Sequence, residues 1–419
     1  MPMMERLKVN AGEVYRIEGL ISLEVKEGKI SVSGGVREKG ERITIPRAKS
    51  VPLEAETDAV VEYTLGAGGT VEKLPGRTIP PDWDAFLQEV IETRPKVVLV
   101  VGGVDVGKTF LTTYFGNRLL ANGIRMAAVD SDVGQADIGP PTTMGLGVFE
   151  RPVALLYEVP LRSMYFVGSM SPSGHMLEFI VGMKWLVERG LKYADLVLVN
   201  TPGWIMGGAG RNLQLYTAEL VNPDYVVALQ RQTELEHLLA CLPSHKIRKL
   251  TVSTKVRKRN PNERAELRAL LLGKYFENSK SVVLNLNKVR FGRTYLKTGV
   301  PLNPAKFGDN IVYAERVPEF TLLVSKRKLD PQELEELSAK HGPIKVIRQG
   351  QEQNVIVALA TEDNEVLGLG IVEKIDFQRG QLVVTTPVEA IEAVKEVQFG
   401  SMKITREGRE IGTVRPGTF

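Results

Sequence analysis

The chain has 419 residues, of which 43% are hydrophobic and 25% charged, and its formal net charge is +4. This length predicts two or three domains, and the mild charge excludes nucleic-acid binding over the whole surface, so any such site has to be a local patch. A single cysteine, Cys241, excludes internal disulfides and multi-cysteine metal centres. No apolar run is long enough to span a bilayer, and the first residues lack the apolar core of a signal peptide, so we expect a cytoplasmic protein without a membrane partner.

Residues 1–80 predict a β-sandwich or barrel domain. Short segments of alternating polarity are separated by glycine-containing turns, with no helical period. These segments are 14–17, 20–25, 30–32, 43–45 and 60–63. Residues 74–81 are rich in proline and glycine and are typical of a linker, after which the apolar spacing predicts a helix over 83–92.

Residues 81–310 predict an α/β domain with a parallel sheet, because expected strands and helices alternate along this part of the chain. The expected strands are 97–101, 125–130, 155–159, 164–167, 195–200 and 224–229, and the expected helices are 108–121, 174–189, 211–220 and 233–240. A ligand is then expected at the carboxyl ends of the strands.

Residues 311–419 predict a second β-rich domain, with one helix over 331–341. Its expected strands are 311–324, 344–347, 355–360, 367–375, 381–386 and 397–404.

A phosphate loop follows the first strand of the central domain. Its glycines, Gly102 and Gly107, frame the pattern Gly-x-x-x-x-Gly-Lys-Thr between an expected strand and an expected helix. In such a loop the backbone N–H groups cradle phosphate oxygens, the lysine reaches the β/γ-phosphates and the threonine hydroxyl binds Mg²⁺. We therefore predict an ATP site with Lys108 as an exposed loop lysine. The expected ATP-binding residues are Gly102, Gly103, Val104, Asp105, Val106, Gly107, Lys108, Thr109 and Phe110.

Two carboxylates, Asp130 and Asp132, end the strand expected at 125–130. Beside a phosphate loop, one can hold Mg²⁺ with Thr109 while the other accepts the proton of an attacking hydroxyl. Taken by itself the pair also fits a solvated turn in which Asp132 starts an Asx-turn.

A third motif, from Asn200 to Trp204, ends the strand expected at 195–200. Asn200 stands where many phosphate-loop proteins have an acid, which leaves the metal to Asp130 and Asp132. Trp204 can stack on a nucleobase, and the alternative is a core tryptophan that caps the sheet.

The basic segment 246–268 predicts either a solvated surface or an arginine-bearing lid over the transferring phosphoryl group. The guanine-reading pattern Asn-Lys-x-Asp is absent, since residues 287–290 are Asn-Lys-Val-Arg, so ATP is preferred over GTP.

Together these motifs resemble the RNA 5′-hydroxyl kinase family, which includes archaeal polyribonucleotide 5′-hydroxyl kinases and the eukaryotic kinase subunit of mRNA 3′-end cleavage and tRNA splicing complexes. The residues that carry the resemblance are Gly102-x-x-Asp105-x-Gly107-Lys108-Thr109, Asp130-x-Asp132-x-Gly134-Gln135, Asn200-Thr201-Pro202-Gly203-Trp204, and the pair Arg259 and Arg264 before Tyr275-Phe276. They span 97–276, and Arg257 offers a competing register for the arginine pair.

The resemblance implies a phosphate-loop kinase domain flanked by two β-rich domains. It implies ATP and Mg²⁺ or another divalent cation as cofactors, the latter on Thr109 and the aspartate pair. The expected catalytic residues are Lys108, Asp130, Asp132, Arg259 and Arg264, and the expected RNA-contacting residues are Gln135, Thr201 and Trp204. The N-terminal domain would help to hold adenine.

The predicted reaction is phosphorylation of the 5′-hydroxyl of RNA, with DNA left open as a second acceptor and RNA-processing proteins as expected partners. Two alternatives stay open at this point. One is an ATP-binding structural subunit of an RNA-processing complex with little turnover, and the other is a small-molecule kinase.

Overall fold

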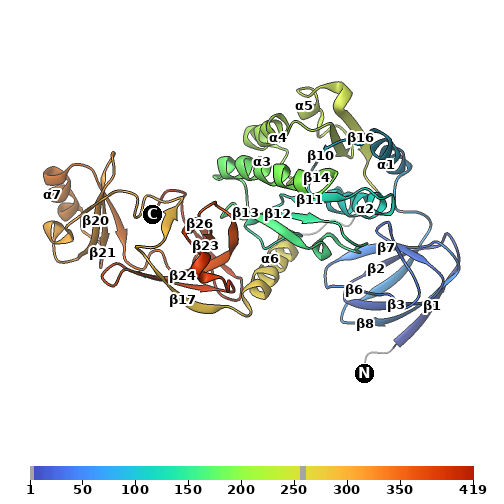
Figure 1. Ribbon diagram of the computed structural model, residues 1–419, viewed down its shortest axis with the longest axis horizontal. Coiled ribbons are helices and arrows are strands. Elements are labelled where there is room, and N and C mark those ends of the chain that lie inside the picture. The colour runs from blue at the N-terminus through green and yellow to red at the C-terminus, as the bar shows by residue number, and fades with distance from the viewer. Residues whose placement is uncertain (1–3, 255–260) are drawn as a thin grey trace. The chain divides into compact units, whose positions relative to one another are not determined.

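The computed structural model describes residues 4–254 and 261–419. Its elements belong to two compact units (Figure 1). The first draws on the ranges Met1–Gly139, Met144–Met164 and Met176–Leu267, and the second on Pro140–Thr143, Tyr165–His175 and Arg268–Phe419. The long helix α6 (Pro261–Phe276) contributes residues to both. No helix in the described part of the chain is long and apolar enough to span a membrane.

The N-terminal part of the first unit is a sandwich of two antiparallel sheets, in the orders β1-β8-β3-β6 and β5-β4-β7-β2-β9. Alternate side chains of both sheets, among them Val25, Ile30 and Leu53, are fully buried in a shared core. The strands are β1 (Met4–Val9), β2 (Val14–Glu18), β3 (Ile21–Glu27), β4 (Ile30–Val32), β5 (Gly35–Arg37), β6 (Arg42–Ile45), β7 (Ser50–Ala55), β8 (Ala59–Leu65) and β9 (Thr70–Leu74).

The rest of the first unit is built on a sheet in the order β13-β12-β11-β14-β10-β15-β16. The five strands from β11 to β16 in this order are parallel, and β12 is antiparallel to β11. The strands are β10 (Val97–Gly102), β11 (Met126–Asp130), β12 (Thr143–Val148), β13 (Leu161–Phe166), β14 (Leu196–Asn200), β15 (Tyr225–Gln230) and β16 (Ile247–Thr251). Asn200 is in register with both Val100 and Asp130, so three strand ends meet at one edge of the sheet.

Helices cover both faces of this parallel sheet. Alternate strand residues such as Val98 and Leu198 pack with α1 (Pro81–Thr93) and α2 (Lys108–Ala121) in one apolar core. Val197, of the opposite parity, lies against Gly190 of α3 (Met176–Tyr193). Helix α4 (Gly207–Val221) packs on α3, and the short α5 (Glu236–Leu239) follows β15.

The second unit holds two further sheets, in the orders β17-β25-β24-β23-β26-β18, with β27 added to β26, and β19-β20-β21-β22. The first sheet comprises β17 (Lys280–Asn285), β18 (Arg290–Gly292), β23 (Val355–Ala360), β24 (Val366–Asp376), β25 (Gln381–Thr386), β26 (Glu396–Ile404) and β27 (Glu410–Thr413). The second comprises β19 (Val300–Leu302), β20 (Ile311–Arg316), β21 (Thr321–Ser325) and β22 (Ile344–Arg348), with α7 (Pro331–His341) between β21 and β22.

The α/β class with flanking β-rich regions is confirmed, and two element predictions are wrong. The strand expected at 155–159 is instead a 3₁₀ turn, η1 (Leu156–Glu158), because Leu156 turns inward to the core beneath α2. The strand expected at 311–324 is two strands, since the N–H of Val317 donates to the carbonyl of Phe320 and closes a hairpin.

Candidate active site

The phosphate loop lies between β10 and α2, as expected. Gly107 precedes the helix with a φ of 99°, a left-handed value that glycine adopts at little cost. Gly102 has no room for a side chain, because an added Cβ would lie 2.7 Å from the carbonyl oxygen of Leu229. The two framing glycines of the motif are thus required by the backbone, which wraps toward the N-terminus of α2.

Lys108 is buried, contrary to the expectation of an exposed loop lysine. Only 8% of the residue is exposed, and Nζ donates to the carbonyl oxygens of Gly102 and Gly103 at 2.8 and 2.6 Å. Burial lowers the pKa of Lys108 to about 8, although the carboxylates of Asp132 and Asp105 act in the opposite direction. The expectation was wrong because the loop folds around the ammonium and its own carbonyls bind it.

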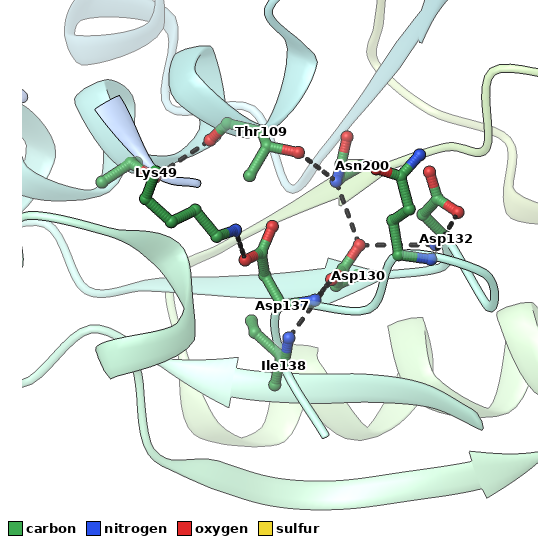
Figure 2. Close-up of polar contacts among 9 residues, drawn as sticks. Lys49, Thr109, Asp130, Asp132, Asp137, Ile138 and Asn200 are labelled. Carbon is green, nitrogen blue, oxygen red and sulfur yellow. Dashed lines mark hydrogen bonds and ion pairs between the residues drawn. The ribbon is translucent and has the colours of Figure 1, made fainter. Parts of the chain in front are cut away.

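Asp130 is a buried hydrogen-bond acceptor at the end of β11 (Figure 2). Its Oδ2 accepts from the N–H groups of Asp137 and Ile138, at 2.6 and 3.2 Å, and its Oδ1 accepts from Nδ2 of Asn200 at 3.0 Å. Burial raises the pKa of Asp130 most, and the negative charges of Asp137 and Asp132 raise it further. The N–H of Asp132 also donates to Oδ1, at 3.4 Å, so four donors fix the orientation of the carboxylate.

Asp132 occupies a different environment two residues later. Its Oδ1 accepts from the N–H groups of Gly134 and Gln135, at 3.3 and 3.1 Å, and the side chain also lines a cavity. Burial raises the pKa of Asp132, while the ammonium of Lys108 lowers it. Asp132 thus makes an Asx-type turn and also lines the cavity, and its metal or base role stays a prediction.

Asn200 joins the acidic pair to the phosphate loop. Its Nδ2 donates to Asp130 and also to Oγ1 of Thr109, the latter at 3.3 Å (Figure 2). Its buried Oδ1 has no hydrogen-bond partner among the described residues. Mg²⁺ binds through one or two carboxylates plus waters and phosphate oxygens, so this set of oxygen donors fits a nucleotide-bound Mg²⁺. Within the described ranges no group of three or more His, Cys, Asp or Glu residues could hold a metal by itself.

A cavity of about 230 Å³ extends from the phosphate loop to the N-terminal sandwich. Lys49, just before β7, lines it and pairs with Asp137, whose N–H contacts Asp130 (Figure 2). Trp83 and Phe110 also line the cavity, with their ring centroids 6.0 Å apart. Sequence reasoning missed Lys49 and Trp83, because no motif marks them. The sandwich brings Lys49 to the loop, and the packing of α1 on α2 brings Trp83 there.

The residues expected to contact RNA lie in different surroundings. Gln135 lines the cavity beside Asp132. The hydroxyl of Thr201 is buried and donates to the carbonyl of Val100 at 2.7 Å. Trp204 is half-buried and packs on Gly210 at the start of α4, so it is not a core tryptophan that caps the sheet.

One expected lid arginine reaches the phosphate loop. Nη2 of Arg264, near the start of α6, lies 2.7 Å from Oδ2 of Asp105. Arg231, which directly follows β15 and was not predicted, donates to the backbone carbonyl of Asp105 at 2.8 Å. Arg257 and Arg259 lie outside the described residues.

Fold and site together define a phosphate-loop protein of the α/β class with a nucleotide cavity. The family model of the mRNA cleavage and polyadenylation factor CLP1 P-loop matches residues 102–278. The chain is 34% identical over 346 residues to a polyribonucleotide 5′-hydroxyl-kinase of Thermococcus kodakarensis, a match that covers 80% of this chain and 96% of that protein. The polyribonucleotide 5′-hydroxyl-kinase of Methanocaldococcus jannaschii is 33% identical and covers 76% of this chain and 90% of its own. The chain belongs to the polyribonucleotide 5′-hydroxyl-kinase family.

The fold is also similar to that of Clp1p in its solved complex with Pcf11p. The TM-score is 0.68 with 14% identity, and the match covers 96% of this chain and 98% of Clp1p. At this identity the likeness concerns the fold.

Proposed function

We propose that this protein is a kinase that transfers the γ-phosphate of ATP to the 5′-hydroxyl of RNA. The observation that carries the proposal is that Lys108, Thr109 and Asp132 line one cavity beside the phosphate loop. The family relatives bear the name of this activity.

The phosphate loop supplies the donor site. Its N–H groups, the N-terminus of α2 and the ammonium of Lys108 bind the β- and γ-phosphates. Lys108 now donates to two carbonyls of its own loop, so its Nζ has to exchange these acceptors for phosphate oxygens. Phe110, which packs against the buried ring of Trp83, and the sandwich residue Lys49 line the part of the cavity that we assign to adenine.

Thr109 and Asp130 are assigned to the metal. Asp130 acts through Asn200, which contacts both residues. Mg²⁺ or another divalent cation, when bound, neutralises charge on the β- and γ-phosphates. Oδ1 of Asn200, which has no hydrogen-bond partner among the described residues, would accept a hydrogen bond from a water held by this cation.

Asp132 is assigned the proton of the attacking hydroxyl. It reaches the cavity, whereas the oxygens of Asp130 are occupied by four donors. The RNA 5′-hydroxyl then attacks in line with the leaving oxygen, and its proton passes to the Asp132 carboxylate. The half-buried indole of Trp204 is available to stack on the terminal base, with Gln135 nearer the reacting oxygen.

The test is incubation with γ-labelled ATP and a 5′-hydroxyl RNA oligonucleotide. The same oligonucleotide with a 5′-phosphate is the control, and matched DNA and a nucleoside are compared as acceptors. We expect label on the 5′-hydroxyl RNA and none on the phosphorylated control. Preferred labelling of the nucleoside would establish a small-molecule kinase instead. ATP binding without transfer to any acceptor would favour the structural subunit, and an RNA-processing protein as partner stays a prediction in either case.

A further inference from the structure

Asp105, in the middle of the phosphate loop, contacts one arginine through its side chain and another through its backbone carbonyl. Its carboxylate accepts from Nη2 of Arg264 at 2.7 Å, with 24% of the arginine side chain and 15% of the aspartate side chain exposed. Its backbone carbonyl accepts from Nη2 of Arg231 at 2.8 Å. The two arginines come from segments far apart in sequence, the turn after β15 and the start of α6.

The backbone of Asp105 explains why two contacts are needed. Its φ of 53° lies in the left-handed region, which costs most residues energy but which aspartate and asparagine tolerate better than others. A hydrogen bond to the carbonyl from Arg231 favours this conformer over the alternatives. The side chain of Asp105 is thereby aimed at α6 while the following residues continue into the loop.

The turn that carries Arg231 is itself fixed. The carboxylate of Glu234 accepts from the N–H groups of Arg231 and Gln232, at 2.6 and 2.8 Å. The guanidinium of Arg231 is thus presented to the loop from a closed turn, and its contact to Asp105 spans 126 residues of sequence.

We propose that Asp105 and Arg231 are positioning residues for the lid arginine Arg264. Arg231 fixes the backbone of Asp105, and the Asp105 carboxylate holds the guanidinium of Arg264 beside the phosphates. The inference rests on the proposed function, because a lid arginine acts only if a phosphoryl group is transferred. A guanidinium that is already oriented stabilises transition-state charge without reorganisation, so its loss of position lowers kcat more than it raises the KM for ATP.

A second role for Asp105 has to be separated from this one. Its carboxylate also lies close enough to Lys108 to favour the charged ammonium. If that effect of charge alone mattered, removal of the carboxylate would act independently of Arg264. A double-mutant cycle between the two positions distinguishes the two roles.

The experiment compares Asp105→Asn, Arg264→Gln and the double variant in steady-state RNA phosphorylation. Asparagine keeps the tolerance for a left-handed backbone and removes the charge. We expect Asp105→Asn to lower kcat about 10- to 100-fold, as a misplaced catalytic group does, with the KM for ATP changed by less than about threefold. The double variant should be no slower than Arg264→Gln. Losses that multiply would overturn the proposal.

Arg231 gives an independent arm if Asp105→Asn folds poorly. Arg231→Gln should lower kcat about tenfold. Arg231→Lys keeps a positively charged donor group and should recover part of that loss. The matched control is Arg211→Gln on α4, an arginine that also donates to a backbone carbonyl, at 3.4 Å from the oxygen of His237, but away from the loop. Equal effects of Arg231→Gln and Arg211→Gln would overturn the assignment. A wild-type protein inactive on RNA would overturn the proposed function as well, whereas an active wild type with multiplying losses would remove only this inference.

Discussion

Nδ2 of Asn200 lies 3.0 Å from Oδ1 of Asp130 and 3.3 Å from Oγ1 of Thr109, so one amide bridges the acidic strand end and the phosphate loop. In Asn200→Ala both contacts are lost and a buried carboxylate oxygen loses a donor, which costs about 1–3 kcal/mol of stability. We expect the Mg²⁺ concentration for half-maximal activity to rise severalfold. A magnesium titration checks this, and an unchanged requirement would remove Asn200 from the metal site.

The two aspartates should separate in their kinetics. Asp132→Asn removes the proposed base and should lower kcat about 10²- to 10⁴-fold without altering the Mg²⁺ requirement. Asp130→Asn should also lose most of the rate, but part of that loss should return at high Mg²⁺. Two variants that remain fully active with Mg²⁺ would show that the acidic pair is structural.

Lys108→Ala should nearly abolish phosphate transfer, because Lys108 is the loop lysine that we assign to the β- and γ-phosphates. The buried ammonium also hydrogen-bonds two carbonyls, so the stability of the variant has to be measured together with its activity. Circular dichroism and ATP-independent thermal melts identify a folded but inactive variant. Turnover within a few-fold of the wild type would contradict the assignment of the phosphate loop.

The lowered pKa of Lys108 predicts a pH dependence of stability. Below pH 8 both folded and unfolded chains bind this proton, and the burial penalty is complete. Between about 8 and the ordinary value of 10.5 the folded chain releases the proton first, so stability contributed at this site rises with pH. The unfolding free energy of the wild type minus that of Lys108→Met should therefore increase over this interval, as measured by denaturant titration at several pH values. A difference that stays flat would mean that the ammonium is solvated.

Trp204→Ala should weaken RNA use by about 1–3 kcal/mol, or roughly 5- to 150-fold in kcat/KM, with ATP affinity little changed. Trp185→Ala on α3 is the matched control, since this half-buried tryptophan stacks with Arg189 on a helix surface outside the proposed site. If both variants lose only thermal stability, the terminal base is bound elsewhere.

The arginine register stays a prediction. Arg259→Ala and Arg264→Ala should act mainly on kcat, where lid arginines contribute factors of about 10³ or more. If Arg257 proves essential and Arg259 dispensable, the lid is retained and the alignment of its first arginine is wrong.

Local signals predicted much of the fold. Helix 331–341 matches α7 because Asp330, Pro331 and Glu333 form a capping box with proline in the first turn. Helix 108–121 likewise matches α2. Strands β1, β7 and β9 were missed, since their polar alternation resembles that of solvated loops until the partner strand is known. The boundaries 1–80, 81–310 and 311–419 remain predictions.

The comparisons confirm the family resemblance and the kinase assignment. Both could be predicted from the sequence because contiguous motifs encode the phosphate loop and the strand ends. The contributions of Lys49, Trp83 and Arg231 could not be predicted, since each reaches the phosphate loop from a distant segment. The burial of Lys108 depends on how the loop closes around it, which the motif alone does not specify.

The nucleotide cavity is walled on one side by the N-terminal sandwich and on the other by the kinase core. A ligand bound in this cavity would contact both modules, each of which has its own apolar core. Nucleotide bound there would link the unfolding of the two modules, so we expect denaturation to become more cooperative as the nucleotide concentration rises. A shortened chain that lacked the sandwich would keep the phosphate loop but would expose the remaining wall of the cavity to water.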